Sequence, residues 1–166
     1  MIPACVPAVM SELRILSLEI QRMPKAYGCS VDNPANYPYY SVCTTSTHDM
    51  SGVRGWWAED PTLTQYYWTE LLHQRGKAPA DCAAWICECI VRQHLDSPAM
   101  LTILPLQDWM AIDEHLRYAD FDAERINIPA NPLHYWRYRM HLTLEELLQA
   151  DDFNRQVSRL VKQSGR

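Results

Sequence analysis

Polar side chains follow three short apolar runs of the chain, at the point where each run ends. They are Gln21 and Arg22 after the first run, Thr47, His48 and Asp49 after the second, and Gln107 and Asp108 after the third. In α/β barrels the catalytic groups come from the carboxyl ends of several strands. If the three runs are parallel strands, we expect these side chains to converge on one mouth.

Tryptophans stand close behind two of these clusters. Trp56 and Trp57 follow His48-Asp49, and Trp109 directly follows Asp108. The chain has 6 Trp and 9 Tyr but only 2 Phe, so it favours rings that carry a hydrogen-bonding group. Indole faces could pack on the C–H faces of a sugar while carboxylates and amides bind its hydroxyls. Trp56 and Trp57 could equally be core residues, because Trp is often largely buried.

Other interpretations of the polar residues stay open. His48-Asp49 could form a turn or half of a metal site, but no further ligand stands at a suitable spacing, so no metal is expected. Asp108 could cap the helix that follows it. The chain has 5 Gly and contains neither a Gly-x-Ser-x-Gly elbow nor a Gly-rich phosphate loop. This argues against a hydrolase triad and against nucleotide binding, and no cofactor is expected.

The three apolar runs are the candidate strands. They are Ile15 to Ile20, Tyr40 to Thr45 and Met100 to Leu104. Each is rich in β-branched or aromatic residues, and none alternates cleanly between polar and apolar positions. This pattern is typical of parallel strands that are covered on both faces.

Helical patterns separate and flank these runs. Asp60 as N-cap and Pro61 predict a helix that ends at Gly76. A second helix is predicted from Pro79 to His94, with Cys82, Trp85, Ile86, Cys89 and Ile90 on its apolar face. Strands alternating with helices predict an α/β fold with a parallel sheet.

The two ends of the chain and one loop complete this outline. A helix is predicted from Pro3 to Leu13, and a long irregular loop from Met23 to Pro38. Thr143 and Glu146 form a capping box for a helical C-terminus. The last amphipathic stripe before Gly165 consists of Phe153, Val157, Leu160 and Val161.

Composition and charge exclude several classes of partner. The chain of 166 residues, enough for about one domain, carries 15 basic and 20 acidic side chains, a net charge of −5. A sequence pI near 5.6 gives no basic footprint for nucleic acid. No stretch approaches the ~18 unbroken apolar residues of a spanning helix, and Met1 to Leu13 lacks the basic start of a secretory signal. We therefore expect a cytoplasmic protein that binds neither nucleic acid nor membrane.

The cysteines fit that location. None of the six is paired at a Cys-x-x-Cys spacing, and most lie in apolar segments, which is typical of reduced, buried thiols. They are Cys5, Cys29, Cys43, Cys82, Cys87 and Cys89.

Longer strings of residues carry a resemblance to a known family. The strings are Thr45-Ser46-Thr47-His48-Asp49-Met50 with Arg54-Gly55-Trp56-Trp57, Arg125-Ile126-Asn127-Ile128-Pro129, His134-Tyr135-Trp136-Arg137-Tyr138-Arg139, and Met1 to Pro24 ending in Leu18-Glu19-Ile20-Gln21-Arg22-Met23. Together they resemble the 4-alpha-glucanotransferases, also called amylomaltases or disproportionating enzymes, of glycoside hydrolase family 77. The likeness covers essentially the whole chain and is greatest to the long form found in the plant cytosol.

The resemblance implies an activity and a role for several residues. These enzymes transfer α-1,4-glucan segments between maltodextrins by a retaining double displacement in a TIM-type barrel. By this likeness Asp49 is the carboxylate that stabilises the transition state, and His48 binds a sugar hydroxyl. An oxocarbenium-like transition state is favoured by such groups. We also expect the glucan to be contacted by Trp56, Trp57, Gln107, Asp108 and Asn127.

The resemblance also implies that the barrel is incomplete. In the family the nucleophile and the acid/base Glu lie upstream of the region that residues 1–166 match, and neither motif is present. We expect residues 1–166 to be the C-terminal portion of one catalytic barrel, with about three of its strands, inactive alone and associating with the missing half or with itself. The alternatives are a non-catalytic α/β module that binds maltodextrin, and an inert fragment.

Overall fold

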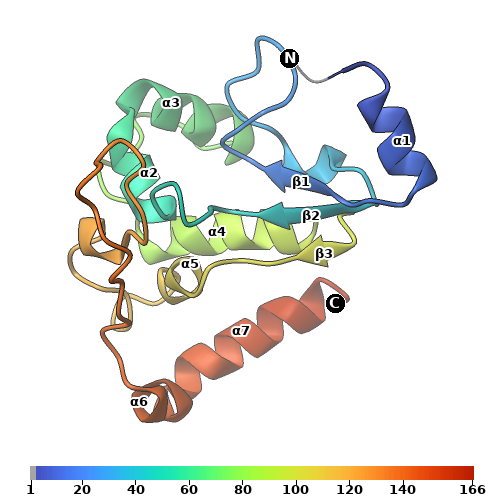
Figure 1. The fold of residues 1–166 in the computed structure, drawn as a ribbon. Helices are drawn as coiled ribbons and strands as arrows, with labels where there is room; N and C mark the ends of the chain where they lie inside the picture. Colours follow the sequence, from blue (N-terminus) through green and yellow to red (C-terminus); the bar gives the residue numbers. More distant parts are fainter. Residues whose placement is uncertain (1–2) are drawn as a thin grey trace.

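A three-stranded parallel sheet organises the structure, a computed structural model that describes residues 3–166. The strands are β1 (Ser17–Ile20), β2 (Ser41–Thr44) and β3 (Leu101–Thr102), in the order β1-β2-β3 (Figure 1). Leu18 lies opposite Val42, which in turn lies opposite Leu101. The predicted parallel strands are confirmed, although each is shorter than its apolar run.

The helices between β2 and β3 form the longest connection. They are α2 (Val53–Glu59), α3 (Pro61–Tyr66), the π-helical turn η2 (Tyr67–Leu71) and α4 (Ala84–Leu95). The Asp60 carboxylate accepts hydrogen bonds from the backbone N–H groups of Thr62 and Leu63, so the predicted N-cap is confirmed. The predicted end at Gly76 is wrong, because the helix widens into the π-helical turn η2 and ends at Leu71, with Leu72 as its C-cap. Gly76 instead has a φ of +80° in the following loop.

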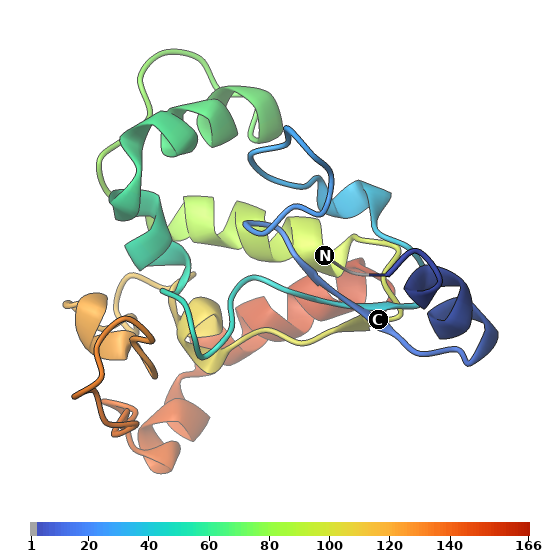
Figure 2. The same ribbon diagram turned by 45° about the horizontal axis from the view of Figure 1, so that its top comes forward.

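Helix α4 runs alongside β2 and β3 (Figures 1 and 2). Its buried positions are Ala84, Ile86, Cys87, Ile90, Val91, His94 and Leu95. Trp85 and Cys89 were predicted on the buried face, but Trp85 is exposed and Cys89 only half-buried. A helix held against both the sheet and the α2–α3 layer buries a broad face, and local spacing alone did not show where that face is centred.

The two faces of the sheet differ in their cover. On one face Cys43 is fully buried, with its Sγ 3.6 Å from the carbonyl oxygen of His94 in α4. On the other face Leu18 (51% exposed), Leu101 (44%) and, just beyond β3, Ile103 (61%) remain open. The sequence predicted a sheet covered on both faces. Within residues 3–166 one face is covered and the other is open.

Shorter helices surround this unit. They are α1 (Val6–Glu12), η1 (Pro34–Asn36), α5 (Leu106–Met110), η3 (Asp122–Glu124), α6 (Leu144–Gln149) and α7 (Asp151–Gln163). The Thr143–Glu146 capping box at the start of α6 is confirmed. On α7, Phe153 and Leu160 are buried, and α7 packs against α4.

Aromatic rings dominate the core between α2, η2 and α4. Trp56, Trp57, Tyr67 and Trp68 meet edge to face, with ring centroids 5.2 to 6.5 Å apart. The buried Tyr67 hydroxyl donates to Gln21, which joins the end of β1 to this cluster. Such pairs stabilise a core beyond the area they bury.

Two further findings concern single predictions. Cys43, Cys82 and Cys87 are buried free thiols, whereas Cys5 and Cys29 are exposed. No helix within residues 3–166 is both long enough and apolar enough to cross a bilayer.

Candidate functional site

The loop from Thr45 to Gly52 joins β2 to α2 and carries His48 and Asp49 at its tip. Its two ends are buried, at Thr45 and Ser46 on one side and Ser51 on the other. The side chains of His48 and Asp49 are 52% and 53% exposed. The loop therefore lifts an imidazole and a carboxylate out of the fold at the carboxyl end of β2.

Asp108, in the helix α5 that follows β3, fixes the base of this loop. Its Oδ2 accepts hydrogen bonds from the hydroxyls of Thr45 and Ser46, each at 2.6 Å, and its Oδ1 accepts from Val53 N at 2.8 Å. The side chain is buried. Its oxygens thus accept three hydrogen bonds inside the fold, which makes Asp108 a support of the loop, and its contact with substrate stays a prediction. Asp108 is the third residue of α5, whose N-cap is Pro105 and receives no side-chain cap, so the capping alternative fails.

Arg22 supports the loop from the end of β1. Its Nη2 donates to Ser51 O at 2.6 Å, its Nε to Thr45 O at 3.2 Å, and its guanidinium lies 5.3 Å from the Trp56 ring. Burial lowers the pKa of Arg22, an effect that the charge of Asp108 opposes. The polar clusters that follow the three strands do converge, as expected, but two of them serve as supports for the third.

Asp49 is held by two side chains. Asn127 Nδ2 donates a hydrogen bond of 2.6 Å to Asp49 Oδ1, and His48 Nε2 lies 3.2 Å from Asp49 Oδ2. Asn127 lies far from Asp49 in sequence, in the irregular segment between α5 and α6 (orange in Figure 1). The structure thus brings together three residues predicted for the site. Both carboxylate oxygens have a fixed neighbour, and the group remains open to solvent.

Trp136 is a site residue that the sequence analysis did not single out. Its ring lies 4.8 Å from the His48 ring, and the residue is 60% exposed. It belongs to the string His134–Arg139, which shows no apolar periodicity of a core helix or strand. An aromatic residue among arginines in such a string was the available indication of an exposed site residue. An aromatic face thereby joins the imidazole and the carboxylate on one exposed surface.

The remaining predicted residues lie inside the fold. Trp57 is 1% exposed and donates through Nε1 to Pro79 O at 2.9 Å, and Trp56 is also buried. Gln107 is buried, and its Nε2 donates to Glu124 O at 3.4 Å. A ring enclosed by core side chains has no face for a sugar. In residues 3–166 these three side chains serve packing and support, and their glucan contacts stay a prediction.

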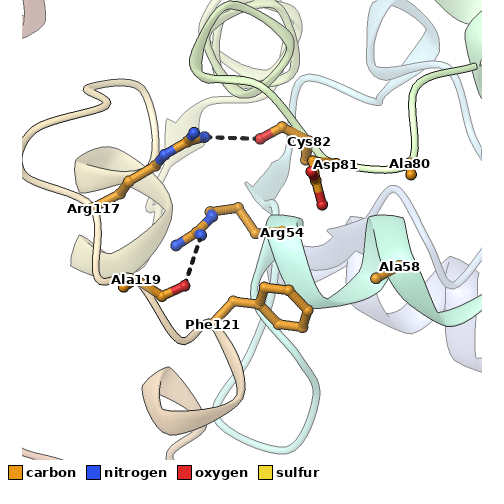
Figure 3. A pocket seen from close by; sticks show the side chains of 8 residues that line it. All are labelled: Arg54, Ala58, Ala80, Asp81, Cys82, Arg117, Ala119 and Phe121. Atoms are coloured by element: carbon orange, nitrogen blue, oxygen red, sulfur yellow. Dashed lines mark hydrogen bonds between the residues drawn. The ribbon is translucent and has the colours of Figure 1, made fainter.

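A cavity of about 240 Å³ opens on the outer side of α2 (Figure 3). Arg54 and Arg117 point into it, and its other lining residues are Ala58, Ala80, Asp81, Cys82, Ala119 and Phe121. Arg117 Nη1 donates to Cys82 O at 2.9 Å. Behind Arg54, Glu124 Oε2 lies 3.7 Å from Arg54 Nη1. Burial raises the pKa of Glu124 to about 7, although the Arg54 charge lowers it in part.

Glu124→Gln should stabilise the fold above neutral pH. The pKa of Glu124 is about 7 in the folded state against an ordinary value of 4.5, so the folded state binds more protons between these values and stability falls as pH rises through this window. Gln does not ionise. Allowing for solvent screening, we expect a gain of ~1 kcal/mol at pH 8, or about 2 to 4 °C in Tm. The measurement is Tm of both proteins from pH 4 to pH 8.

The difference between the two melting curves isolates Glu124 from other carboxyl groups. It should grow between pH 4.5 and 7 and then stay level. Glu145→Gln, at an exposed position of α6, is the control and should show no such growth. A Glu124→Gln difference that is independent of pH would contradict the prediction.

The part of the chain that the structure describes contains no candidate metal site. No group of three or more His, Cys, Asp or Glu side chains in residues 3–166 is arranged to hold an ion. The exposed site presents a carboxylate, an amide, an imidazole and an indole.

A family comparison decides the relationship of the chain. The glycoside hydrolase 77 model, described as 4-alpha-glucanotransferase, matches residues 1–144. The chain belongs to this family. The rice 4-alpha-glucanotransferase DPE2 is 40% identical over all 166 residues, and the chain spans 18% of that protein. The 4-alpha-glucanotransferase of Chlamydia pneumoniae is 27% identical over 76% of the chain, which spans 24% of it.

A solved amylomaltase structure confirms the fold class. The amylomaltase from Streptococcus agalactiae, in complex with acarbose, superposes on the whole chain with a TM-score of 0.73 at 18% identity. The chain covers 30% of that TIM-barrel enzyme. Residues 3–166 therefore have the fold of a part of this family's barrel, with three parallel strands and their helices.

Proposed function

We propose that residues 1–166 form the C-terminal portion of the catalytic barrel of a 4-alpha-glucanotransferase. The whole enzyme would transfer α-1,4-glucan segments between maltodextrins with retention at the anomeric carbon. The observation that carries this proposal is the exposed Asp49 carboxylate at the end of β2, held by Asn127 at 2.6 Å and next to His48 at 3.2 Å. The acarbose bound to the matched amylomaltase supports a maltodextrin-like substrate.

Asp49 has the chemistry required of a transition-state stabiliser. An oxocarbenium-like transition state places positive charge on the sugar ring, and a fixed carboxylate nearby lowers its energy. Asn127 and His48 restrict the carboxylate, so little reorganisation is needed when charge develops. His48 and Asn127 also carry polar atoms that suit sugar hydroxyls, and these contacts strengthen as the ring distorts.

The two other carboxyl groups of a retaining mechanism belong, in this proposal, to the rest of the barrel. A nucleophile and an acid/base group must lie about 5 to 5.5 Å apart. The rest of the barrel would also cover the open face of the sheet, where Leu18, Leu101 and Ile103 are exposed. Burying such a face and pairing the outer strands β1 and β3 is what closes a barrel. The expected partner of this segment is thus the remaining part of the same domain.

We also propose a cytoplasmic location. The rice relative that matches the whole chain is named DPE2 without a plastid designation. The Arabidopsis relative named chloroplastic/amyloplastic matches only 69% of the chain at 27% identity.

An assay of maltotriose disproportionation tests the proposed activity. The intact enzyme that contains residues 1–166 should release glucose and form maltodextrins longer than maltotriose. The 166-residue chain alone should form neither, because the nucleophile and the acid/base group are supplied from elsewhere. Adding the separately produced remainder of the barrel should restore activity. An intact enzyme that makes no longer product would refute the proposal, and so would an equally active isolated chain.

A non-catalytic maltodextrin-binding role is the second candidate. It is favoured by the exposed Trp136 ring beside His48 and Asp49, since an open aromatic face suits a sugar. Calorimetric titration of the isolated chain with maltoheptaose distinguishes the two. Saturable binding at or below millimolar sugar, together with an intact protein that lacks transferase activity, would favour this second role.

A further inference from the structure

Arg54 ties helix α2 to the segment that leads to Asn127. Its Nη1 donates to the carbonyl oxygen of Tyr118, and its Nη2 donates to that of Ala119 at 3.4 Å. Its Nη1 also lies 3.7 Å from Glu124 Oε2, and its guanidinium lies 5.7 Å from the centre of the Phe121 ring. Figure 3 shows the side chain reaching across from α2 to Ala119 above Phe121. One side chain thus contacts four residues of a single segment.

This segment has little regular structure of its own. Between Tyr118 and Asn127 the only helical turn is η3 (Asp122–Glu124), three residues long. Besides Arg54, Gln107 Nε2 reaches it by a 3.4 Å bond to Glu124 O, and Arg125 Nη1 lies 3.7 Å from Glu59 Oε1 of α2. The Tyr118 ring also lies 4.8 Å from the His141 ring. A segment with few internal hydrogen bonds depends on outside contacts for its position. Arg54 supplies the largest group of such contacts.

The backbone of α2 allows a close approach at this point. Gly55 follows Arg54, and a Cβ atom built there would lie 3.5 Å from Phe121 Cδ2 and 3.0 Å from Ser51 Cβ. The glycine lets Phe121 lie against the helix while Arg54 reaches over it. Arg54 and Gly55 therefore form one docking place for the segment.

We propose that Arg54 is a positioning residue for the transfer reaction, which holds the Tyr118–Asn127 segment on α2 so that the Asn127 amide stays on Asp49. This inference rests on the proposed role of Asp49. Arg54 acts through the segment, because its contacts are with Tyr118, Ala119, Phe121 and Glu124. A planar guanidinium with a fixed fork of donors can hold two successive carbonyl groups at once, which a lysine ammonium does less well.

The cavity beside Arg54 offers a chemical test of this role. Arg54 lines the ~240 Å³ cavity, so its truncation to Ala would enlarge a space that already exists. Guanidinium ion in solution could enter and donate to the carbonyl groups of Tyr118 and Ala119. A merely structural loss elsewhere in the fold would not be restored in this way.

A double-mutant cycle on the intact enzyme tests the inference, with maltotriose as substrate. Arg54→Ala should lower kcat about 10- to 100-fold, the size of effect that misplacing a group near the reacting atoms produces. In an Asn127→Ala background the same change should have an effect of less than about threefold, because the group that Arg54 positions is gone. Millimolar guanidinium should restore part of kcat in Arg54→Ala but none in the double variant. Arg155→Ala, at an exposed position of α7, is the matched control and should retain full activity.

Each outcome bears on the inference in one direction. The inference would be overturned if the fold-losses in kcat from the two substitutions simply multiply in the double variant. It would also be overturned if Arg54→Ala leaves kcat unchanged. If Arg54→Ala does not fold, Arg54→Lys is measured in its place. Arg54→Lys should lower kcat partially in the otherwise unchanged enzyme and should not change kcat in the Asn127→Ala enzyme. Asp49→Asn is measured in parallel: if that variant stays active, the proposed function fails. If Asp49→Asn is inactive while the cycle is multiplicative, only the role of Arg54 fails.

Discussion

Asp49→Asn should lower kcat for maltotriose disproportionation at least about 10²-fold in the intact enzyme. The substitution keeps the shape of the side chain and leaves an oxygen that can accept from Asn127. It removes the negative charge that would face the developing positive charge on the sugar. Because Asp49 is half exposed, on a loop tip, and not part of the core, we expect Tm to change little.

The control for this prediction is Asp152→Asn. Asp152 is an exposed carboxylate at the start of α7, bonded to Arg155. Its replacement should leave both kcat and Tm near the values of the unmodified enzyme. Near-normal turnover by Asp49→Asn would remove Asp49 from the mechanism and leave the binding role as the better account of the site.

Asp108→Ala should lower the free energy of unfolding by about 3 to 5 kcal/mol. The change removes a buried acceptor of three hydrogen bonds and leaves the Thr45 and Ser46 hydroxyls and the Val53 N–H without it. It also removes a negative charge near the buried Arg22 guanidinium. Urea unfolding of the protein measures the loss, and the loop that carries Asp49 should be the first part to lose protection from hydrogen exchange.

Ser46→Ala calibrates this effect. It deletes one of the three donors and leaves the carboxylate with two, so the cost should be about 1 kcal/mol. Asp96→Ala, at an exposed position after α4, should cost less than about 0.5 kcal/mol. Equal losses for Asp108→Ala and Asp96→Ala would show that the buried network contributes nothing.

The parallel sheet could be predicted because its signal is local. Apolar runs without alternation, separated by helical patterns, left few other topologies. Helix α2 was not predicted because it has only seven residues, starts after Gly52 and contains Gly55. It therefore has neither a capping side chain nor a long periodic stripe that would indicate a helix. The end of α3 was misplaced for a related reason. Gly76 is a good stop signal, but the helical segment ends at Leu71, shortly after the buried Tyr67 and Trp68 of η2.

The site was predictable in part. His48 and Asp49 follow a strand on a short loop, and their exposure agrees with a site. Asp108 and Gln107 follow a strand in the same way, yet their side chains turn inward to support the fold. The position of a residue after a strand does not tell an exposed site residue from a buried support. The direction of its side chain depends on the conformation of the segment that follows the strand. The contact between Asp49 and Asn127 joins parts of the chain that only the folded segment between α5 and α6 brings together.

The distribution of the six tryptophans gives the protein a spectroscopic consequence. Trp56, Trp57 and Trp68 are buried among other aromatic rings, and Trp109 is half-buried. Trp85 is exposed on α4, and Trp136 is exposed beside an imidazole. The buried indoles should emit at short wavelength and be insensitive to added quenchers. Trp136 should emit to the red and be quenched by its histidine neighbour. The difference in emission between the protein and its Trp136→Phe variant therefore isolates one fluorophore next to Asp49, which reports on that surface alone.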